Sequence, residues 1–313
     1  MSAAAARVLV VGSLNLDSVY RLTAAPRAGE TVTALESDFA VGGKGGNQAI
    51  AAARAGAAVS MVGALGDDDA GQTIADSLDR AGVDTRHLSR IAGRPSGSAV
   101  VLVDRTGENR IVLSPGANGH LAQATVSAGL SECRPGDIVV LQNEIPPVLS
   151  VSAARAAHDR GLRVIWNAAP APVAAEQIPP ADIIVVNEEE LRALASLHGL
   201  HAGAGLQTEV DRLADATGVA VVCTAGAHGV YFRTRAESGH VAAPRVDAVD
   251  TTAAGDTFVG YLAAALVHGE RRFTDACHHA ASAASLAVTR RGASPSIPTR
   301  SEVHEFERTI DQE

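Results

Sequence analysis

Short apolar runs rich in β-branched residues alternate with helical segments along most of the chain. Such runs are typical of strands that are buried on both faces of a parallel sheet. The expected strands are 8–11, 59–62, 138–141, 162–166, 183–186 and 219–223. The expected helices are 47–55, 70–81, 122–131, 148–160, 188–198 and 206–217. This alternation predicts an α/β fold with a mainly parallel central sheet that helices cover on both faces.

Two segments, 18–40 and 98–113, interrupt this order. Both alternate polar and apolar residues, and the second contains a turn signal at residues 104–107, so we expect antiparallel strands outside the main sheet. Strands without a partner sheet leave exposed edges and an apolar face, which favours pairing with a second subunit. The alternative is a pair of hairpins within a monomer. No linker or internal repeat divides the chain, so we expect one domain over residues 1–313.

The composition excludes several classes of protein. The chain has 313 residues, of which 46% are hydrophobic and 19% charged, as in globular proteins. A net charge of −9 argues against a nucleic-acid surface. The three cysteines form no CxxC pair, which indicates a reducing compartment without a disulfide or zinc framework. Residues 1–7 lack the apolar core of a signal peptide, and no apolar run could span a bilayer, so we expect a soluble cytoplasmic protein.

Two carboxylates, Asp250 and Asp256, bracket a run of small residues, and apolar residues recur at helical spacing over 258–266. Gly255-Asp256 is therefore expected to open a helix, with the apolar residues on one face. Free N–H groups at a helix start bind anions, and Gly255 lets a ligand approach the backbone. A carboxylate at an anion site is unfavourable unless it accepts a proton from a substrate. The segment favours phosphoryl transfer with Asp256 as general base; the alternative is an acidic N-cap.

Four glycines surround Lys44 in the segment Gly42-Gly43-Lys44-Gly45-Gly46-Asn47-Gln48-Ala49, just before an expected helix. The glycines would leave backbone free to contact a polar ligand; the alternative is a flexible turn with a solvated lysine. A Walker A loop is excluded because Asp38 and Gly45 occupy positions that require Gly and Ser or Thr. A Rossmann dehydrogenase is excluded as well, since no G-x-G-x-x-G follows the first strand.

Segments 42–49 and 250–258 together resemble the two signatures of the ribokinase (PfkB) family of carbohydrate kinases, and the resemblance runs from Val8 to Pro298. The other matches are Gly12-Ser13-Leu14-Asn15-Leu16-Asp17, Pro26 with Gly29-Glu30-Thr31, Gly63 with Gly66-Asp67-Asp68, Gly116-Ala117-Asn118, Asn167-Ala168-Ala169-Pro170-Ala171-Pro172, Asn187 with Glu190, and Thr224 with Gly226 and Gly229. The resemblance implies a three-layer sandwich. It also implies that 18–40 and 98–113 form a small lid through which two subunits pair as a homodimer.

The resemblance also implies a set of sugar-binding residues. Asn15 and Asp17 follow the first strand and Glu144 follows 138–141, at the sheet edge where such folds bind ligands. The alternatives are an Asx turn and surface acids. The implied set is Asn15, Asp17, Gly43, Lys44, Gly45, Gly46, Asn47, Glu144 and Asp256.

In such a kinase Asp256 would take the proton from the sugar hydroxyl. The N–H groups of Ala254, Gly255 and Asp256 would stabilise the transferred group, each donor being worth roughly 3 kcal/mol. The resemblance assigns Asn187 and Glu190 to a magnesium ion and its waters. An Asn followed by Glu three residues later is also a capping box, and both roles are compatible.

The resemblance places ATP along Thr224-Ala225-Gly226-Ala227-His228-Gly229 and a late helix in which Ala281 stands where the family commonly has His or Asn. It also implies a potassium site built mostly from backbone carbonyls. The residues at that site are Asp250, Thr252, Ala287, Arg290, Gly292 and Ser296.

We therefore expect ATP-dependent phosphorylation of the 5-hydroxyl of D-ribose, with magnesium required and potassium activating. Deoxyribose, fructose or a nucleoside are the alternative acceptors. A nucleoside kinase needs lid aromatics to stack the base, and the lid segments contain only Tyr20 and Phe39. A sugar or nucleotide sensor without activity is a further alternative, disfavoured because it need not keep Asp256.

Overall fold

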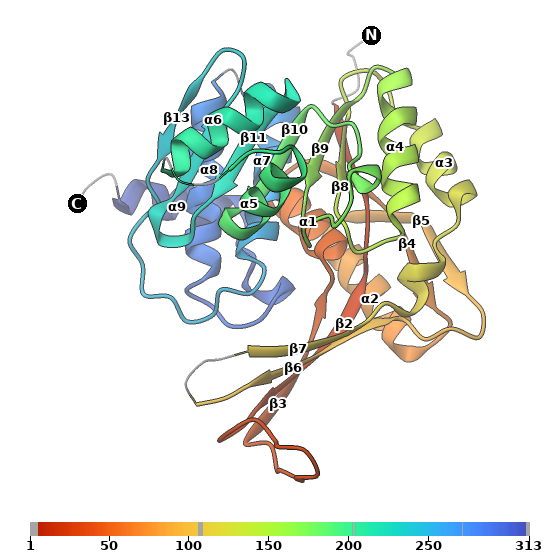
Figure 1. Cartoon of the computed structure of the whole chain (residues 1–313). Coiled ribbons are helices and arrows are strands. Elements are labelled where there is room, and N and C mark those ends of the chain that lie inside the picture. Colours follow the sequence, from red (N-terminus) through yellow and green to blue (C-terminus); the bar gives the residue numbers. More distant parts are fainter. Residues whose placement is uncertain (1–5, 106–108, 202, 204, 271, 311–313) are drawn as a thin grey trace.

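The computed structural model describes residues 6–105, 109–201, 203, 205–270 and 272–310, and it confirms the expected three-layer α/β architecture with a small separate sheet (Figure 1). The strands of the large sheet are β1 (Arg7–Val11), β4 (Ala58–Gly66), β5 (Val83–Ile91), β8 (Ile138–Leu141), β9 (Arg163–Asn167), β10 (Ile183–Asn187), β11 (Ala220–Thr224), β12 (Val230–Arg233) and β13 (Ser238–Val241). The helices are α1 (Lys44–Arg54), α2 (Asp69–Arg80), α3 (Gln123–Ser131), α4 (Pro147–Asp159), α5 (Glu188–Leu197), α6 (Leu206–Thr217), α7 (Ala254–Val267), α8 (Phe273–Ala287) and α9 (Arg300–Ile310). Among the described helices, none is long and apolar enough to cross a membrane.

Alternate residues of the central strands enter two different hydrophobic cores. In β1, Val8 and Val10 belong to a core that α1, α2, α7 and α8 cover, with Val303 of α9 at its margin. Leu9 and Val11 belong to a second core on the opposite face, under α3, α4, α5 and α6. Both faces of β1 are therefore buried, which explains why its sequence is continuously apolar.

The large sheet has the order β13-β12-β11-β10-β9-β8-β1-β4-β5. β1 pairs in parallel with both β4 and β8, so the chain winds outward from β1 in both directions. The carboxyl ends of strands on either side of such a reversal leave a crevice in which ligands bind. The crevice next to β1 and β8 is where the candidate residues of the sequence converge.

The edge strands were not predicted. β5 has the sequence VDTRHLSRI, and its burial is only partial, so no apolar run marks it. β12 and β13 are short strands that pair antiparallel with β11 and with each other. A strand near the edge of a sheet needs fewer apolar residues, because fewer of its side chains enter a core.

The small sheet, which we call the lid, has the order β3-β2-β6-β7 and projects from the body (Figure 1). Its strands are β2 (Asn15–Arg21), β3 (Glu36–Gly42), β6 (Gly97–Val103) and β7 (Asn109–Ser114). The pairs β2–β3 and β6–β7 are antiparallel as expected, but β2 and β6 are parallel. The reason is that β2 follows β1 and β6 follows β5, and both leave the parallel sheet in the same direction. The expected turn at 104–107 reaches residues 106 and 107, which lie outside the described residues.

Two helices begin earlier than the sequence suggested. α1 starts at Lys44 rather than Asn47, and α7 starts at Ala254. The apolar residues of α7 were expected on one face, but every residue from Asp256 to Ala264 is buried. The cause is that α7 lies between α1 and α8 against the sheet. The closest approach to α1 is at Gly260, where an added Cβ would lie 2.4 Å from Ala51 Cβ and 2.7 Å from the Gln48 carbonyl oxygen.

We predict that Gly260→Ala lowers the free energy of unfolding by about 1–3 kcal/mol, because the added methyl group forces α1 and α7 apart. Gly119→Ala is the matched control, since its Cβ would meet only Pro115 Cβ, at 3.9 Å. Urea denaturation followed by circular dichroism measures both variants. Equal stability of the two variants would contradict the tight contact between the helices.

Candidate active site

Asp256 lies in the first turn of α7, and its side chain is held by α1. Asn47 Nδ2 donates to Asp256 Oδ2 at 2.9 Å, and Gln48 Nε2 donates to Asp256 Oδ1 at 2.8 Å. The residue is only 7% exposed. Two neutral amides thus fix the direction of a buried carboxylate without placing a cation on it, and each carboxylate oxygen keeps a lone pair for another partner.

A second layer of amides holds Gln48 in turn. Gln48 Nε2 also donates to Asn167 Oδ1 at 3.0 Å, and Gln142 Nε2 donates to Gln48 Oε1 at 2.7 Å. All three side chains are buried. The sequence reasoning gave none of them a role. The sequence offered one signal: Gln142 directly follows the buried strand β8, and Asn167 ends β9. A buried amide without a hydrogen-bond partner would be costly at either place.

The start of α7 is open toward the crevice. An added Cβ on Gly255 would meet no atom within 4 Å, so the backbone is accessible there. The Ala254 amide donates to the Thr251 carbonyl oxygen at a long 3.3 Å, whereas the amides of Gly255 and Asp256 belong to the turn that has no intrahelical acceptor. Ala253, the residue before the helix, has a left-handed backbone with φ 60°. Such strain in a non-glycine residue is typical of functional sites.

The glycines around Lys44 allow a close approach of α1 to the chain after β1. Gly45 and Gly46 lie in the first turn of α1 and are buried. An added Cβ on Gly45 would lie 2.7 Å from the backbone of Ser13. These glycines therefore let α1 pack against the chain after β1. Gly43 has φ 79°, and an added Cβ there would lie 2.9 Å from the Asn15 amide, so it makes the tight turn into the helix.

Asn15 and Asp17 reach the crevice from β2, and Glu144 reaches it from the loop after β8. Asn118, which the sequence reasoning left without a role, donates to Asn15 Oδ1 at 2.9 Å. Glu144 Oε2 accepts hydrogen bonds from Ser13 Oγ at 2.6 Å and from the Lys44 amide at 3.0 Å. Among the described residues, buried Asp17 Oδ1 and Asn47 Oδ1 have no hydrogen-bond partner. Buried oxygens of this kind are acceptors for the hydroxyl groups of a ligand.

Several carboxyl groups surround one lysine, Lys44, in the crevice. Burial, together with the charges of Glu144 and Asp256, raises the pKa of Asp17 to about 7, even though a hydrogen bond to the Ala99 backbone opposes the shift. Burial favours neutral Lys44, but the carboxylates of Asp256, Glu144 and Glu190 outweigh it and raise the pKa of the ammonium group. Lys44 therefore stays charged and is the cation of the crevice.

A polar cavity of about 310 Å³ lies in front of α7. Its lining residues include Lys44, Asn187, Glu190, Thr224, Gly226, Ala254, Gly255 and Asp256. Asn187 and Glu190 also form the expected capping box: Asn187 N donates to Glu190 Oε2, and Glu190 N donates to Asn187 Oδ1, both at 2.8 Å. Burial raises the pKa of Glu190, although the Asn187 amide and Lys44 act against it. An amide and a carboxylate beside a phosphate-sized space suit magnesium, which binds one or two carboxylates plus substrate phosphates.

A second, mainly apolar cavity of about 420 Å³ shares Gly226, Ala254 and Gly255 with the first. Ala227, Gly229 and Ala281 line it as expected, and Thr251 and Arg245 were missed. Two predicted residues of the 224–229 segment do not line either cavity. Ala225 is buried and its amide closes the loop on the Gly229 carbonyl at 2.8 Å, while His228 is exposed and lies outside both cavities.

The two segments of the proposed cation site meet in space. Gly292 N donates to Asp250 Oδ2 at 3.0 Å, and Thr252 donates to Asp250 Oδ1 through both its amide and its hydroxyl. Burial disfavours ionised Asp250, but these bonds lower the pKa of its carboxyl. Ser296 is buried and donates to the Ala293 carbonyl at 2.8 Å. Oxygen is the ligand that hard cations prefer, so the donor set fits a cation such as potassium.

Comparison with known proteins gives a consistent result over nearly the whole chain. The profile of the pfkB family of carbohydrate kinases matches residues 5–300. A ribokinase of Haemophilus influenzae is 36% identical over 298 residues, which covers 95% of this chain and 97% of that protein. A ribokinase of Schizosaccharomyces pombe is 38% identical over 309 residues, with 95% and 96% covered. The structure of Arabidopsis thaliana ribokinase complexed with ribose and ATP has a TM-score of 0.85 and 32% identity, with 97% and 99% covered.

The raised pKa of Asp17 predicts a pH-dependent penalty on stability. The pKa of the Asp17 carboxyl is about 7 in the folded state and about 3.9 in the unfolded state. The folded state therefore binds more protons between these values, and stability falls as the pH rises through this interval. The free energy of unfolding of Asp17→Asn, relative to that of wild type, should therefore rise by on the order of 2 kcal/mol between pH 5 and pH 8. Urea denaturation at each pH measures this difference. The control is Asp38→Asn on the exposed part of β3; if it shows the same gain, Asp17 is not the group responsible.

Proposed function

Because the chain belongs to the pfkB family of carbohydrate kinases, we propose that it transfers the γ-phosphoryl group of ATP to the 5-hydroxyl of D-ribose. One observation carries the proposal most directly. A buried carboxylate, Asp256, lies in the open first turn of α7, in a crevice that also contains two buried oxygens without a hydrogen-bond partner among the described residues. The relatives named ribokinase support ribose as the acceptor.

Sugar hydroxyls would be held by groups from both the lid and the body. Asp17 of β2 and Asn47 of α1 each offer an oxygen that has no partner among the described residues. Asn15 and Glu144 are pre-oriented by Asn118 and Ser13. A small polyol supplies several hydroxyl donors in a compact space, which matches these acceptors. Gly43, Gly45 and Gly46 contribute by bringing α1 close to the end of β1.

The chemical step uses Asp256 as general base. Its carboxylate would accept the hydroxyl proton as the sugar oxygen attacks the γ-phosphorus, and the bond from phosphorus to the bridging oxygen of ADP breaks. Asn47 and Gln48 keep the carboxylate oriented during this transfer. The amides of Gly255 and Asp256, with Ala254 beside them, would stabilise negative charge on the transferred group, and Lys44 adds a positive charge to the same cavity.

Metal ions would complete the site. Asn187 and Glu190 would hold magnesium, which neutralises charge on the phosphates. Potassium would be held through oxygen atoms of two segments: Asp250 and Thr252 before α7, and Ala287, Arg290, Gly292 and Ser296 at and after the end of α8. The Asp250–Gly292 hydrogen bond joins the two segments, so an ion there would fix the backbone of the anion site.

The apolar cavity would receive the adenine. Its walls come from Ala281 on α8, from Phe258 on α7 and from the 226–230 segment. Ala281 has no hydrogen-bonding side chain, so packing rather than base-specific hydrogen bonding would hold the ring there. Arg245 alone among the described lining residues is charged.

A nucleoside is disfavoured as the acceptor by the direction of the lid side chains. Phe39 pairs with Ser18, and Tyr20 lies two residues beyond Ser18, so both aromatic rings belong to the sheet face opposite to Asp17. Asp17 faces the crevice. Neither ring can stack a base beside the sugar-binding acids.

That outer face of the lid supports a homodimer. Phe39, Ser18, Val100 and Val112 lie in one row across the four strands. Phe39 is 66% exposed and Val112 67%. Exposed apolar side chains on a sheet with open edges favour contact with another subunit. We infer that a second copy of the lid makes this contact.

A cytoplasmic location is consistent with the thiols. Cys133, Cys223 and Cys277 are all buried and free. Burial also raises the pKa of Cys223 to about 12, which keeps the thiol protonated and unreactive. Unpaired cysteines of this kind are typical of a reducing compartment.

We predict that Phe39→Asp converts the dimer to a monomer, because a carboxylate replaces an exposed apolar side chain on the edge strand β3 of the lid. Val173→Asp is the control, since Val173 is also exposed but lies outside the lid. Light scattering coupled to gel filtration gives the mass of each variant. A wild-type protein that is monomeric at micromolar concentration would refute the interface.

The reaction is tested by ADP release from ATP and magnesium with a panel of pentoses, hexoses and nucleosides, in potassium or in sodium. Ribose should give the highest kcat/KM, with a faster rate in potassium. Asp256→Asn should lower kcat at least ~10²-fold while sugar binding, measured by calorimetry, changes little. A nucleoside turned over faster than ribose, or an Asp256→Asn variant with near-normal kcat, would reject the assignment.

A further inference from the structure

A third cavity, of about 530 Å³, lies between α7, α8 and α9, away from the crevice. None of its lining residues lines the two cavities of the active site. Its polar wall carries four imidazoles, three carboxylates and one guanidinium, from His268, Glu270, Asp275, His278, His279, Arg300, His304 and Glu307. With neutral histidines this wall is net negative, and it is rich in the ligands of transition metals.

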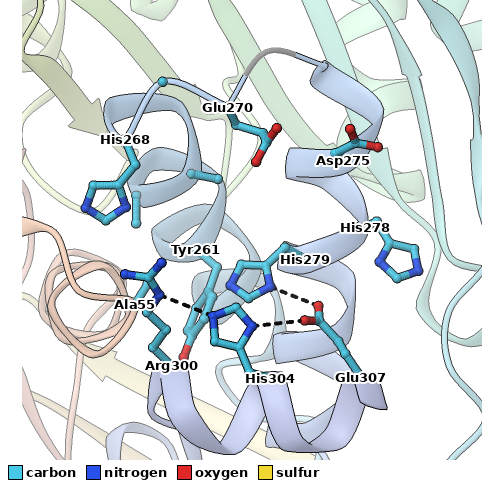
Figure 2. Close-up of a pocket in the computed structure, with 13 residues that line it drawn as sticks. Ala55, Tyr261, His268, Glu270, Asp275, His278, His279, Arg300, His304 and Glu307 are labelled. Carbon is cyan, nitrogen blue, oxygen red and sulfur yellow. Dashed lines mark hydrogen bonds and ion pairs between the residues drawn. The ribbon is translucent and has the colours of Figure 1, made fainter. Parts of the chain in front are cut away.

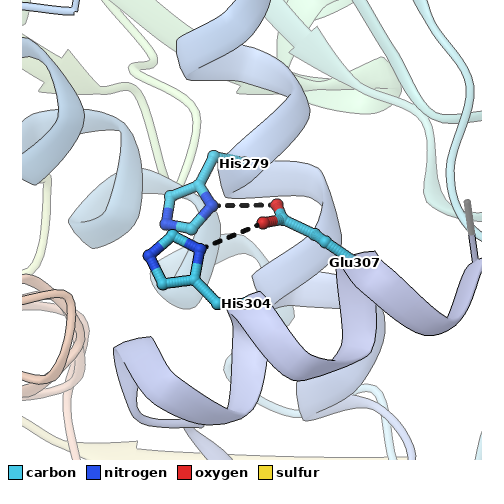
Figure 3. Close-up of side chains that lie close together, drawn as sticks. All are labelled: His279, His304 and Glu307. Carbon is cyan, nitrogen blue, oxygen red and sulfur yellow. Dashed lines mark hydrogen bonds and ion pairs between the residues drawn. The ribbon is translucent and has the colours of Figure 1, made fainter.

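Three of these side chains converge on one point (Figure 2). His279 comes from α8, and His304 and Glu307 lie three residues apart on one face of α9. His279 Nδ1 is 2.9 Å from Glu307 Oε1, and His304 Nδ1 is 3.4 Å from Glu307 Oε2 (Figure 3). Among the described residues, this is the one group of three such side chains whose ligand atoms all lie within 4.8 Å of one another.

These separations match the spacing of ligands around a small metal ion. Nitrogen and oxygen atoms bound at about 2.1 Å to a tetrahedral zinc ion lie roughly 3.4 Å apart. The 2.9 and 3.4 Å distances need only small side-chain shifts to reach that arrangement. Two imidazoles and one carboxylate are a ligand set of zinc sites that keep an open fourth position, and here all three side chains line the cavity.

The current hydrogen bonds do not prevent metal binding. Arg300 Nε donates to His304 Nε2 at 3.3 Å, which is a long bond on an exposed side chain. A metal at Nδ1 moves the imidazole hydrogen to Nε2, and Arg300 can turn to solvent. A glutamate side chain is ordinarily ionised at neutral pH, as a metal ligand must be.

The position of the three residues gives such an ion a structural role. α9 has one fully buried residue, Val303, so its attachment to the body depends on polar contacts. One such contact is the ion pair between Arg290 Nη2 and Glu302 Oε1, at 2.7 Å. We propose that His279, His304 and Glu307 form a binding site for a divalent transition metal of the zinc class, which joins α9 to α8.

The choice of metal follows from the ligands. Imidazole nitrogen favours zinc, copper or nickel, whereas magnesium prefers oxygen and keeps several of its waters. The site should therefore ignore the magnesium that accompanies ATP. Because the metal would bind the folded state and bridge two helices, it should also raise the melting temperature.

The test is calorimetric titration of zinc chloride into metal-free, untagged protein, without nucleotide and with excess magnesium chloride. We expect one zinc ion per chain and an increase in the melting temperature. His304→Ala, which removes a half-exposed ligand, and the isosteric Glu307→Gln should each weaken zinc binding at least about 10-fold and abolish the thermal shift. His278→Ala is the matched control, because His278 lines the same cavity outside the three ligands, and it should bind zinc as wild type does.

Three results would overturn the proposal. The first is no stoichiometric binding by a wild-type protein of normal melting temperature. The second is unchanged affinity in both His304→Ala and Glu307→Gln. The third is loss of binding in Glu190→Gln instead, which would assign the zinc to the nucleotide crevice. Circular dichroism of each metal-free variant shows whether it is folded, so the two ligand variants test the site independently.

Discussion

The close crossing of α1 and α7 at Gly260 is the contact on which the rest of the site depends. It brings the amides of Asn47 and Gln48 onto the carboxylate of Asp256. Burying an ionised carboxylate is costly unless hydrogen bonds replace the lost water. Here the neutral amides of Asn47 and Gln48 supply hydrogen bonds to the side chain that we propose as the base. Packing in the core and the chemistry of the site are therefore parts of one arrangement, since the helix that fills the core also carries the base.

Much of this arrangement could be read from the sequence, because burial on both faces leaves an apolar run that is easy to recognise. β1, β8 and β11 carry such runs and were placed to within one or two residues. β5 and β13 were not recognised, because at the edges of the sheet their side chains are only partly buried. Motif spacing located Asp256 at a helix start, and the structure agrees. It could not reveal that Gly45 and Gly46 let α1 pack against Ser13 and Leu14, because only coordinates show which atoms approach a glycine.

The supporting amides show a second limit of sequence reasoning. Gln48 and Asn118 contact the candidate residues Asp256 and Asn15 from 103 or more positions away in the chain, and Gln142 contacts Gln48 from 94 positions away. No local pattern relates a residue to a partner at that separation. Such residues are recognisable only as polar side chains in otherwise apolar surroundings, which marks them as hydrogen-bonded without saying to what. Motifs thus pointed to the candidate residues themselves, but not to the residues that orient them.

Asp17 and Asp256 lie in different parts of the structure. Asp17 is on β2 of the lid, and Asp256 is on α7 of the core. In the proposed mechanism, an alcohol held by both acids would bridge the lid and the core. The connections at Leu14 and Gly43, which join β2 and β3 to the core, would then help to set the distance between the two acids. Such an arrangement would favour a full-sized acceptor over water and so protect the nucleotide from hydrolysis.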